Sequence, residues 1–75
     1  MGRDRDKTLL KALGRHLQKA RKRKGLTQEA LAKASGLHRR YIIKLEMGEG
    51  NPTFLVLHDL ARAMGLRPED LTALK

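Results

Sequence analysis

The stretch of sequence that decides the fold runs from Thr27 to Glu46 and reads TQEALAKASGLHRRYIIKLE. It contains two short segments with amphipathic helical patterns, which meet at Gly36. Glycine has no Cβ and adopts positive φ without strain, so the chain can turn sharply at this point. Three cations stand on the second segment, namely Arg39, Arg40 and Lys44. The pattern predicts two short helices joined by a tight turn, the second of them basic.

Further helices are predicted on both sides of this pair, so the expected fold class is all-α, a compact bundle of five helices. The predicted ranges are about 7–24, 28–34, 39–47 and 54–64, with a short last helix from Pro68 onward. Thr27 and Thr53 are expected to cap the helices that follow them. The apolar residues expected to face the core are Leu10, Leu13, Leu17 and Ala20, then Tyr41, Ile42 and Leu45, then Phe54, Leu57, Leu60, Ala61 and Met64, and finally Leu71 and Leu74. Residues 1–6 lack this periodicity and are expected to form a mobile arm before a single domain over residues 7–75.

The charge of the chain is strongly basic and unevenly distributed. Its 75 residues carry 17 Lys and Arg against 8 Asp and Glu, a formal net charge of +9. Ten of the cations fall within residues 1–24, which hold only two acids, whereas residues 53–75 hold three residues of each sign. This distribution predicts that one end of the molecule meets a polyanion.

The residues needed for several other functional classes do not occur in the sequence. There is no cysteine, which excludes disulfides and cysteine-ligated zinc. His16, His38 and His58 have no spacing that pairs two of them on one helix, so we expect solvated histidines and neither a metal site nor a cofactor. No Gly-rich phosphate loop, nucleophile elbow or isolated carboxylate pair suggests an enzyme. The longest apolar run, residues 54–57, is too short to span a bilayer, and a cytoplasmic protein is expected.

Residues spread over most of the chain follow one known pattern. They are Leu13-Gly14, Leu17, Arg21, Gly25-Leu26-Thr27-Gln28, Leu31-Ala32, Ser35-Gly36-Leu37, Tyr41-Ile42, Leu45-Glu46, Gly48, Asn51-Pro52, Leu57, Leu60-Ala61, Met64-Gly65 and Leu71. In this order and spacing the chain resembles the phage-repressor and Cro-like helix-turn-helix family, also called the xenobiotic-response-element (XRE) type. The resemblance implies a five-helix bundle whose third helix enters the major groove of DNA, while the second helix lies across its mouth.

The resemblance also implies which residues contact DNA. Arg39, Arg40 and Lys44 match the family's base-reading positions, and they lie away from the predicted apolar face of their helix. Arginine can bond guanine O6 and N7 bidentately, so the DNA site should contain G·C pairs. Two departures from the family pattern, His38 and Ile43, are expected beside them, with Ile43 near a thymine methyl. The expected phosphate contacts are Gln28, which matches the family's phosphate position, together with Thr27, Lys22, Arg23, Lys24, Asn51 and Thr53.

Two further expectations concern structure and assembly. In the family, a cation at the position of Arg21 and an acid at the position of Glu46 form a partly buried ion pair that ties the first helix to the third. Surplus aliphatic residues near the less charged end suggest contacts of a dimer, for which the candidates are Leu55, Val56, Leu71 and Leu74. Scattered exposed aliphatic residues without such a role are the alternative.

These observations favour a sequence-specific DNA-binding transcriptional regulator, expected to act as a repressor and as a homodimer on a palindromic operator. The alternative is an antitoxin, an interaction protein that binds a toxin partner and also regulates its own promoter. A coactivator that bridges proteins fits less well because its basic helix would have no purpose. Copurification with a small partner would distinguish the antitoxin from the regulator.

Overall fold

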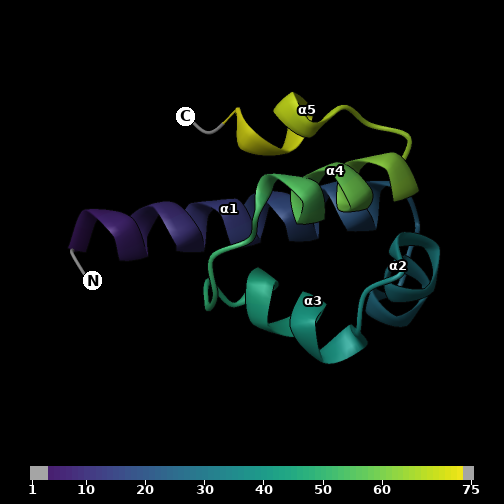
Figure 1. The fold of residues 1–75 in the computed structure, drawn as a ribbon, viewed down its shortest axis with the longest axis horizontal. Helices are drawn as coiled ribbons and strands as arrows, with labels where there is room; N and C mark the ends of the chain where they lie inside the picture. The colour runs from purple at the N-terminus through teal and green to yellow at the C-terminus, as the bar shows by residue number, and fades with distance from the viewer. Residues whose placement is uncertain (1–3, 74–75) are drawn as a thin grey trace.

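The computed structural model describes residues 4–73, and all of its regular structure in this range is helical. The five helices are α1 (Asp4–Arg23), α2 (Gln28–Ser35), α3 (Arg39–Glu46), α4 (Phe54–Ala63) and α5 (Pro68–Thr72). Figure 1 shows α1 as the long axis of the bundle, with α3 on one side of it and α5 on the other, α4 crossing in front of it in this view, and α2 near its C-terminal end. The expected all-α bundle of five helices is confirmed.

The first helix begins earlier than the sequence pattern predicted. Residues 4–6 belong to α1, so the expectation of a mobile arm over residues 1–6 is wrong for these three; residues 1–3 lie outside the described part of the chain. Asp4 and Asp6 stand in the first turn, where carboxylates complement the positive end of the helix dipole. Charge at the helix terminus therefore supports a turn that has no apolar periodicity.

The predicted caps and turn fix the ends of the short helices. The Thr27 hydroxyl accepts a hydrogen bond from the Ala30 backbone N–H at 3.0 Å, and the Thr53 hydroxyl accepts one from the Val56 N–H at 3.2 Å. Gly36 has a φ of 75°, in the left-handed region, and its N–H donates to the carbonyl of Ala32. These contacts confirm the two predicted caps and the turn predicted at Gly36 between the two short helices of the opening stretch.

The core lies between α1 and the four shorter helices. Four large side chains are fully buried: Leu31, Ile42, Leu60 and Leu71. The predicted stripe of α4 is wrong at its start, because Phe54 is 66% exposed. Phe54 is the first residue of α4 and lies beyond the edge of the core, whereas Val56, one turn before Leu60, packs against it.

Gly14 sets how closely α1 approaches α3. It is buried, and a Cβ built on it would overlap the backbone carbonyl of Leu45 and stand 2.7 Å from the carbonyl oxygen of Glu46. No larger residue fits unless the two helices move apart. The pattern of the sequence contains this glycine, but its packing role follows only from the tertiary contact.

Candidate nucleic-acid interface

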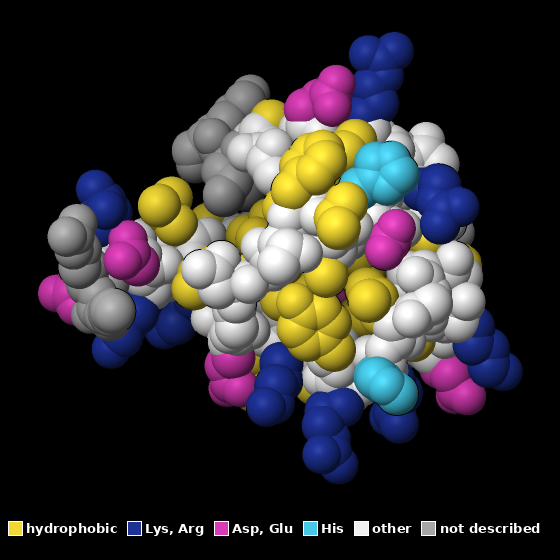
Figure 2. Space-filling view, in the orientation of Figure 1, with side chains coloured by type: hydrophobic (Ala, Val, Ile, Leu, Met, Phe, Trp, Pro, Cys, Tyr) yellow, Lys and Arg dark blue, Asp and Glu magenta, His cyan; other side chains and the backbone are white. Residues whose placement is uncertain are grey.

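The outer face of α3 carries a group of cations without acidic partners. Arg39, Arg40 and Lys44 are exposed, and within residues 4–73 none of them has a carboxylate at ion-pair distance. Together with His38 and Tyr41 they line a shallow hollow at the start of the helix. Figure 2 shows dark blue side chains projecting from the edge of the molecule formed by α3. This face offers a concentrated positive charge to a ligand.

His38 and Ile43, which are also expected to contact the bases, differ in how exposed their side chains are. His38 stands at the N-cap of α3 and is exposed, but its side chain makes no capping hydrogen bond. The imidazole is therefore not committed to the helix terminus. Ile43 is half-buried, so only part of its side chain is available to a contact such as a thymine methyl.

A buried ion pair joins α1 to α3, at the positions expected for it. The Arg21 guanidinium donates to the Glu46 carboxylate twice, from Nε to Oε2 at 2.6 Å and from Nη2 to Oε1 at 3.0 Å. The two side chains are only 8% and 3% exposed. Two parallel hydrogen bonds of this kind fix the geometry of the pair as well as its distance. Because Glu46 is the last residue of α3, the pair holds that helix at a defined position on α1.

Gln28 extends this pair to α2. Its Nε2 donates to Oε1 of Glu46 at 3.0 Å, while Arg21 Nη1 donates to the carbonyl of Leu26 at 2.8 Å. We call Arg21, Glu46 and Gln28 the anchor cluster. It connects three helices at one carboxylate. A side-chain amide has two N–H donors, so one N–H of Gln28 is held by Glu46 and the other is not used in that bond.

The remaining residues expected to contact phosphate do not form one surface. Lys22 is exposed at the end of α1, and Asn51 and Thr53 are exposed in the loop between α3 and α4. Arg23 and Lys24, in contrast, line a separate hollow together with side chains of α1 and the region of α5. Lys22, Arg23 and Lys24 were expected to act together because they are consecutive in the sequence. Successive residues of a helix, however, point in directions about 100° apart, so neighbouring cations face different surfaces.

Comparison with known proteins places this arrangement in a family. The model of the helix-turn-helix family matches residues 17–71, which include both short helices and the anchor cluster. The chain belongs to the helix-turn-helix family. This is a class of DNA-binding transcriptional regulators and not of enzymes, in agreement with the resemblance seen in the sequence.

The helix-turn-helix protein is similar to regulators from bacteria and archaea. It is 39% identical over 61 residues to y4dJ of Sinorhizobium fredii, named as an HTH-type transcriptional regulator; the match covers 81% of this chain and 79% of that protein. It is 45% identical over 49 residues to an HTH-type transcriptional regulator of Methanothermobacter thermautotrophicus, covering 65% of this chain and 71% of the relative.

Solved structures of two regulators have the same fold as the helix-turn-helix protein. The restriction-modification controller protein C.AhdI of Aeromonas hydrophila superposes with a TM-score of 0.80 at 39% identity, covering 85% of this chain and 96% of that one. The clp gene regulator ClgR of Corynebacterium glutamicum gives a TM-score of 0.82 at 32% identity, covering 87% and 69% of the two chains. These superpositions confirm the predicted architecture.

The residues expected at a dimer contact are not equally accessible. Leu55 is 72% exposed, next to the exposed Phe54, whereas Val56 is half-buried and packs against the core. Leu71 is fully buried, so its assignment to a dimer contact is wrong. It is the buried residue of the short helix α5 and attaches that helix to the core. Leu74 lies outside the described residues.

One histidine has a structural partner that sequence reasoning missed. His16 is half-buried, and its Nε2 donates to the backbone carbonyl of Asp70 at 2.7 Å, which links α1 to α5. The expectation of a solvated side chain did not include this contact, which joins positions 54 residues apart in the sequence. Within residues 4–73, no group of three potential metal ligands occurs.

None of the helices in residues 4–73 combines the length and the apolar character needed to cross a membrane.

Proposed function

We propose that this protein is a sequence-specific repressor that binds a palindromic operator as a homodimer. The observation that carries the proposal is the set of exposed cations on α3, on a helix whose position is fixed by the anchor cluster. A helix held in a fixed position, whose exposed cations have no acidic partner, is suited to a groove lined by phosphates and base edges. Repression follows from occupancy, because a regulator bound over a promoter excludes the polymerase.

Base recognition is assigned to the exposed face of α3. Arg39 and Arg40 have the bidentate donors that match guanine, and Lys44, one turn further along, reaches the same groove as a point charge. His38 and Ile43 border this set, the first as a hydrogen-bonding group and the second through the exposed part of its apolar side chain. The operator half-site is therefore expected to contain at least one G·C pair.

Phosphate contacts are assigned to the two sides of α3. On one side are Thr27 and Gln28, at the N-terminus of α2, where backbone N–H groups and the helix dipole favour an anion. On the other are Asn51 and Thr53 in the loop before α4. Lys22 adds charge near α2. Arg23 and Lys24 attract DNA at a distance through their charge, with no contact assigned to them.

Dimerisation is proposed because one recognition helix covers too few base pairs for typical operator affinity. Two such helices bind one face of DNA when their half-sites are about 34 Å apart, one turn of the duplex. Phe54 and Leu55 supply an exposed apolar surface at the start of α4, in a region of low net charge. A two-fold contact that includes both residues, bordered by Val56, would bury them.

Selection of binding sites from a random duplex library tests this proposal. The purified protein should enrich an inverted repeat whose half-sites are about 10 base pairs apart, and a reporter controlled by the enriched site should be repressed. The variant Leu55→Lys, which places a charge in the proposed contact, should enrich only a single half-site. Enrichment of a non-palindromic sequence by both proteins would contradict the dimer, and activation of the reporter would contradict repression.

A further inference from the structure

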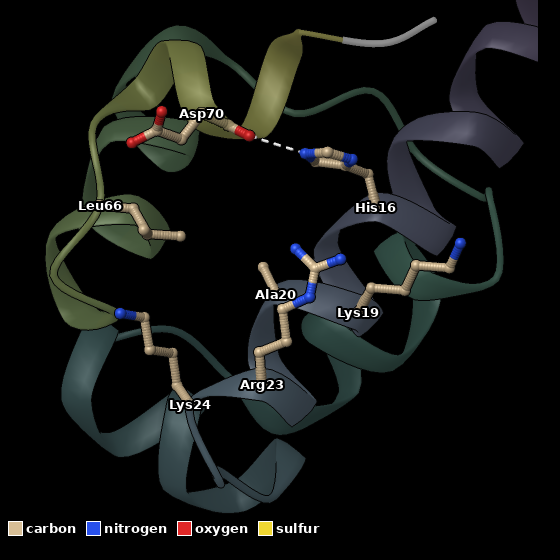
Figure 3. A pocket seen from close by; sticks show the side chains of 7 residues that line it. All are labelled: His16, Lys19, Ala20, Arg23, Lys24, Leu66 and Asp70. Atoms are coloured by element: carbon tan, nitrogen blue, oxygen red, sulfur yellow. Dashed lines mark hydrogen bonds between the residues drawn. The ribbon is translucent and has the colours of Figure 1, made fainter.

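A second hollow lies on the other side of α1 from the anchor cluster. It has a volume of about 530 Å³ and is formed by the C-terminal half of α1, the turn between α4 and α5, and the start of α5. Figure 3 shows the seven side chains that line it, which are His16, Lys19, Ala20, Arg23, Lys24, Leu66 and Asp70. Nothing in the proposed binding of operator DNA uses this space.

The hollow and the exposed surface of α3 face different sides of α1. At ~100° per residue, the line through His16, Ala20 and Arg23 lies ~140° around α1 from Arg21. Arg21 faces α3 through Glu46, and His16 faces α5 through its hydrogen bond to Asp70. A duplex held by α3 therefore lies on the opposite side of α1 from the hollow.

The hollow is positively charged, although an acidic residue lines it. The Asp70 carboxylate is turned away and accepts a hydrogen bond from the Arg67 N–H at 2.9 Å, so this residue contributes only its carbonyl, which His16 occupies. In Figure 3 the Arg23 guanidinium extends toward His16, and Lys24 extends toward the turn after α4. In the part of the chain that the structure describes, neither cation has an acidic partner.

Apolar side chains complete the hollow between the two cations. Ala20 forms its floor on α1, and the Leu66 side chain projects into it from the turn between α4 and α5. Its volume lies within the ~300–1,000 Å³ range of small-molecule sites. Two cations suit one dianionic group, while the apolar surface beside them suits an uncharged body attached to that group.

From this combination we propose that the hollow binds a phosphate monoester of nucleotide size. Arg23 and Lys24 bind the phosphate, with Lys19 at the rim as a further cation, and the organic part of the ligand covers Ala20 and Leu66. Guanidinium groups recognise phosphate oxygens bidentately, which gives Arg23 the leading role. The ligand would bridge α1 and the turn after α4, two parts of the bundle that are distant in sequence.

Titration of the ¹⁵N-labelled protein followed by NMR tests this site, with AMP as the probe. AMP should shift the backbone amide signals of Ala20, Arg23 and Leu66 in a saturable manner. Adenosine, which lacks the phosphate, and inorganic phosphate, which lacks the apolar body, should each bind at least ~10-fold more weakly than AMP. Equal binding of AMP and either fragment would overturn the assignment.

Paired variants separate this site from general attraction to a basic surface. Arg23→Gln combined with Lys24→Gln should weaken AMP binding at least ~10-fold, whereas Arg15→Gln combined with Lys22→Gln, which removes the same charge from exposed positions of α1, should change it less than ~2-fold. Similar losses in both pairs would refute a defined pocket. A short DNA duplex should shift signals of α2 and α3 without displacing AMP; displacement would show that the hollow belongs to the DNA surface and would overturn the proposal.

Discussion

Replacing Glu46 by Gln should remove much of the stability of this domain, although the side chain keeps its size. Both oxygens of the Glu46 carboxylate accept hydrogen bonds from N–H groups. Arg21 Nε donates to Oε2, and Arg21 Nη2 and Gln28 Nε2 both donate to Oε1. An amide provides only one oxygen, so its NH₂ group must face at least one of these donors. Arg21, 8% exposed, would keep its charge without a counterion, and the Leu26 carbonyl would be its remaining partner.

The cost of breaking such a buried pair from one side is about 3–5 kcal/mol. A small domain has a total stability near the lower end of ~5–15 kcal/mol, so Glu46→Gln should leave the protein close to its unfolding transition at 25 °C. Urea unfolding followed by circular dichroism measures this loss. Glu49→Gln removes the same charge from an exposed loop and should change the free energy of unfolding by less than ~0.5 kcal/mol.

A compensating double variant distinguishes charge from packing. Arg21→Met with Glu46→Leu replaces both members of the pair by apolar side chains, which should recover most of the lost stability because no buried charge is left alone. Equal stability of Glu46→Gln and Glu49→Gln would refute the reasoning, since it would mean that the carboxylate of Glu46 is not buried against Arg21 in solution.

Three further outcomes follow from the packing and the charge. Gly14→Ala should destabilise the protein by about 1–3 kcal/mol in the same unfolding assay, because its Cβ meets the backbone oxygens at the end of α3; unchanged stability would contradict the close approach. Leu71→Ala should cost about 2–5 kcal/mol of unfolding free energy, whereas Leu55→Ala should cost less than ~0.5 kcal/mol and instead weaken self-association measured by sedimentation; the reverse order would mean that these residues are misplaced. If about six phosphates are neutralised, the logarithm of the DNA-binding constant should fall with the logarithm of salt concentration at a slope near −5, and a salt-independent complex would argue against DNA binding through these cations.

Local signals made the starts of α2 and α4 and the end of α2 predictable. Thr27 and Thr53 cap their helices through hydrogen bonds that span three residues, and Gly36 turns the chain through its own φ. Each of these roles can therefore be recognised from a few neighbouring residues of the sequence. The Arg21–Glu46 pair is different, because it joins residues 25 apart, and only the resemblance to a known family indicated it.

The sequence predictions failed where tertiary packing decides whether a side chain is buried and what it contacts. Phe54 and Leu71 have similar apolar character, yet one is exposed at a helix start and the other is fully buried in a five-residue helix. The His16 contact with Asp70 and the hollow around Arg23 depend on how α5 packs on α1. Their spacing in the sequence contains no periodic signal of that packing.

In the proposed complex α3 reads bases, whereas cations elsewhere only attract the phosphate backbone. The most direct measurement is the affinity of Arg39→Ala for its selected operator and for random duplex DNA at fixed salt, with Lys33→Ala as a control that removes an exposed cation from α2. The Arg39 variant should lose about 1–3 kcal/mol on the operator and much less on random DNA, and the control should lose equally little on both. Equal losses on operator and random DNA for Arg39→Ala would contradict base recognition by this helix.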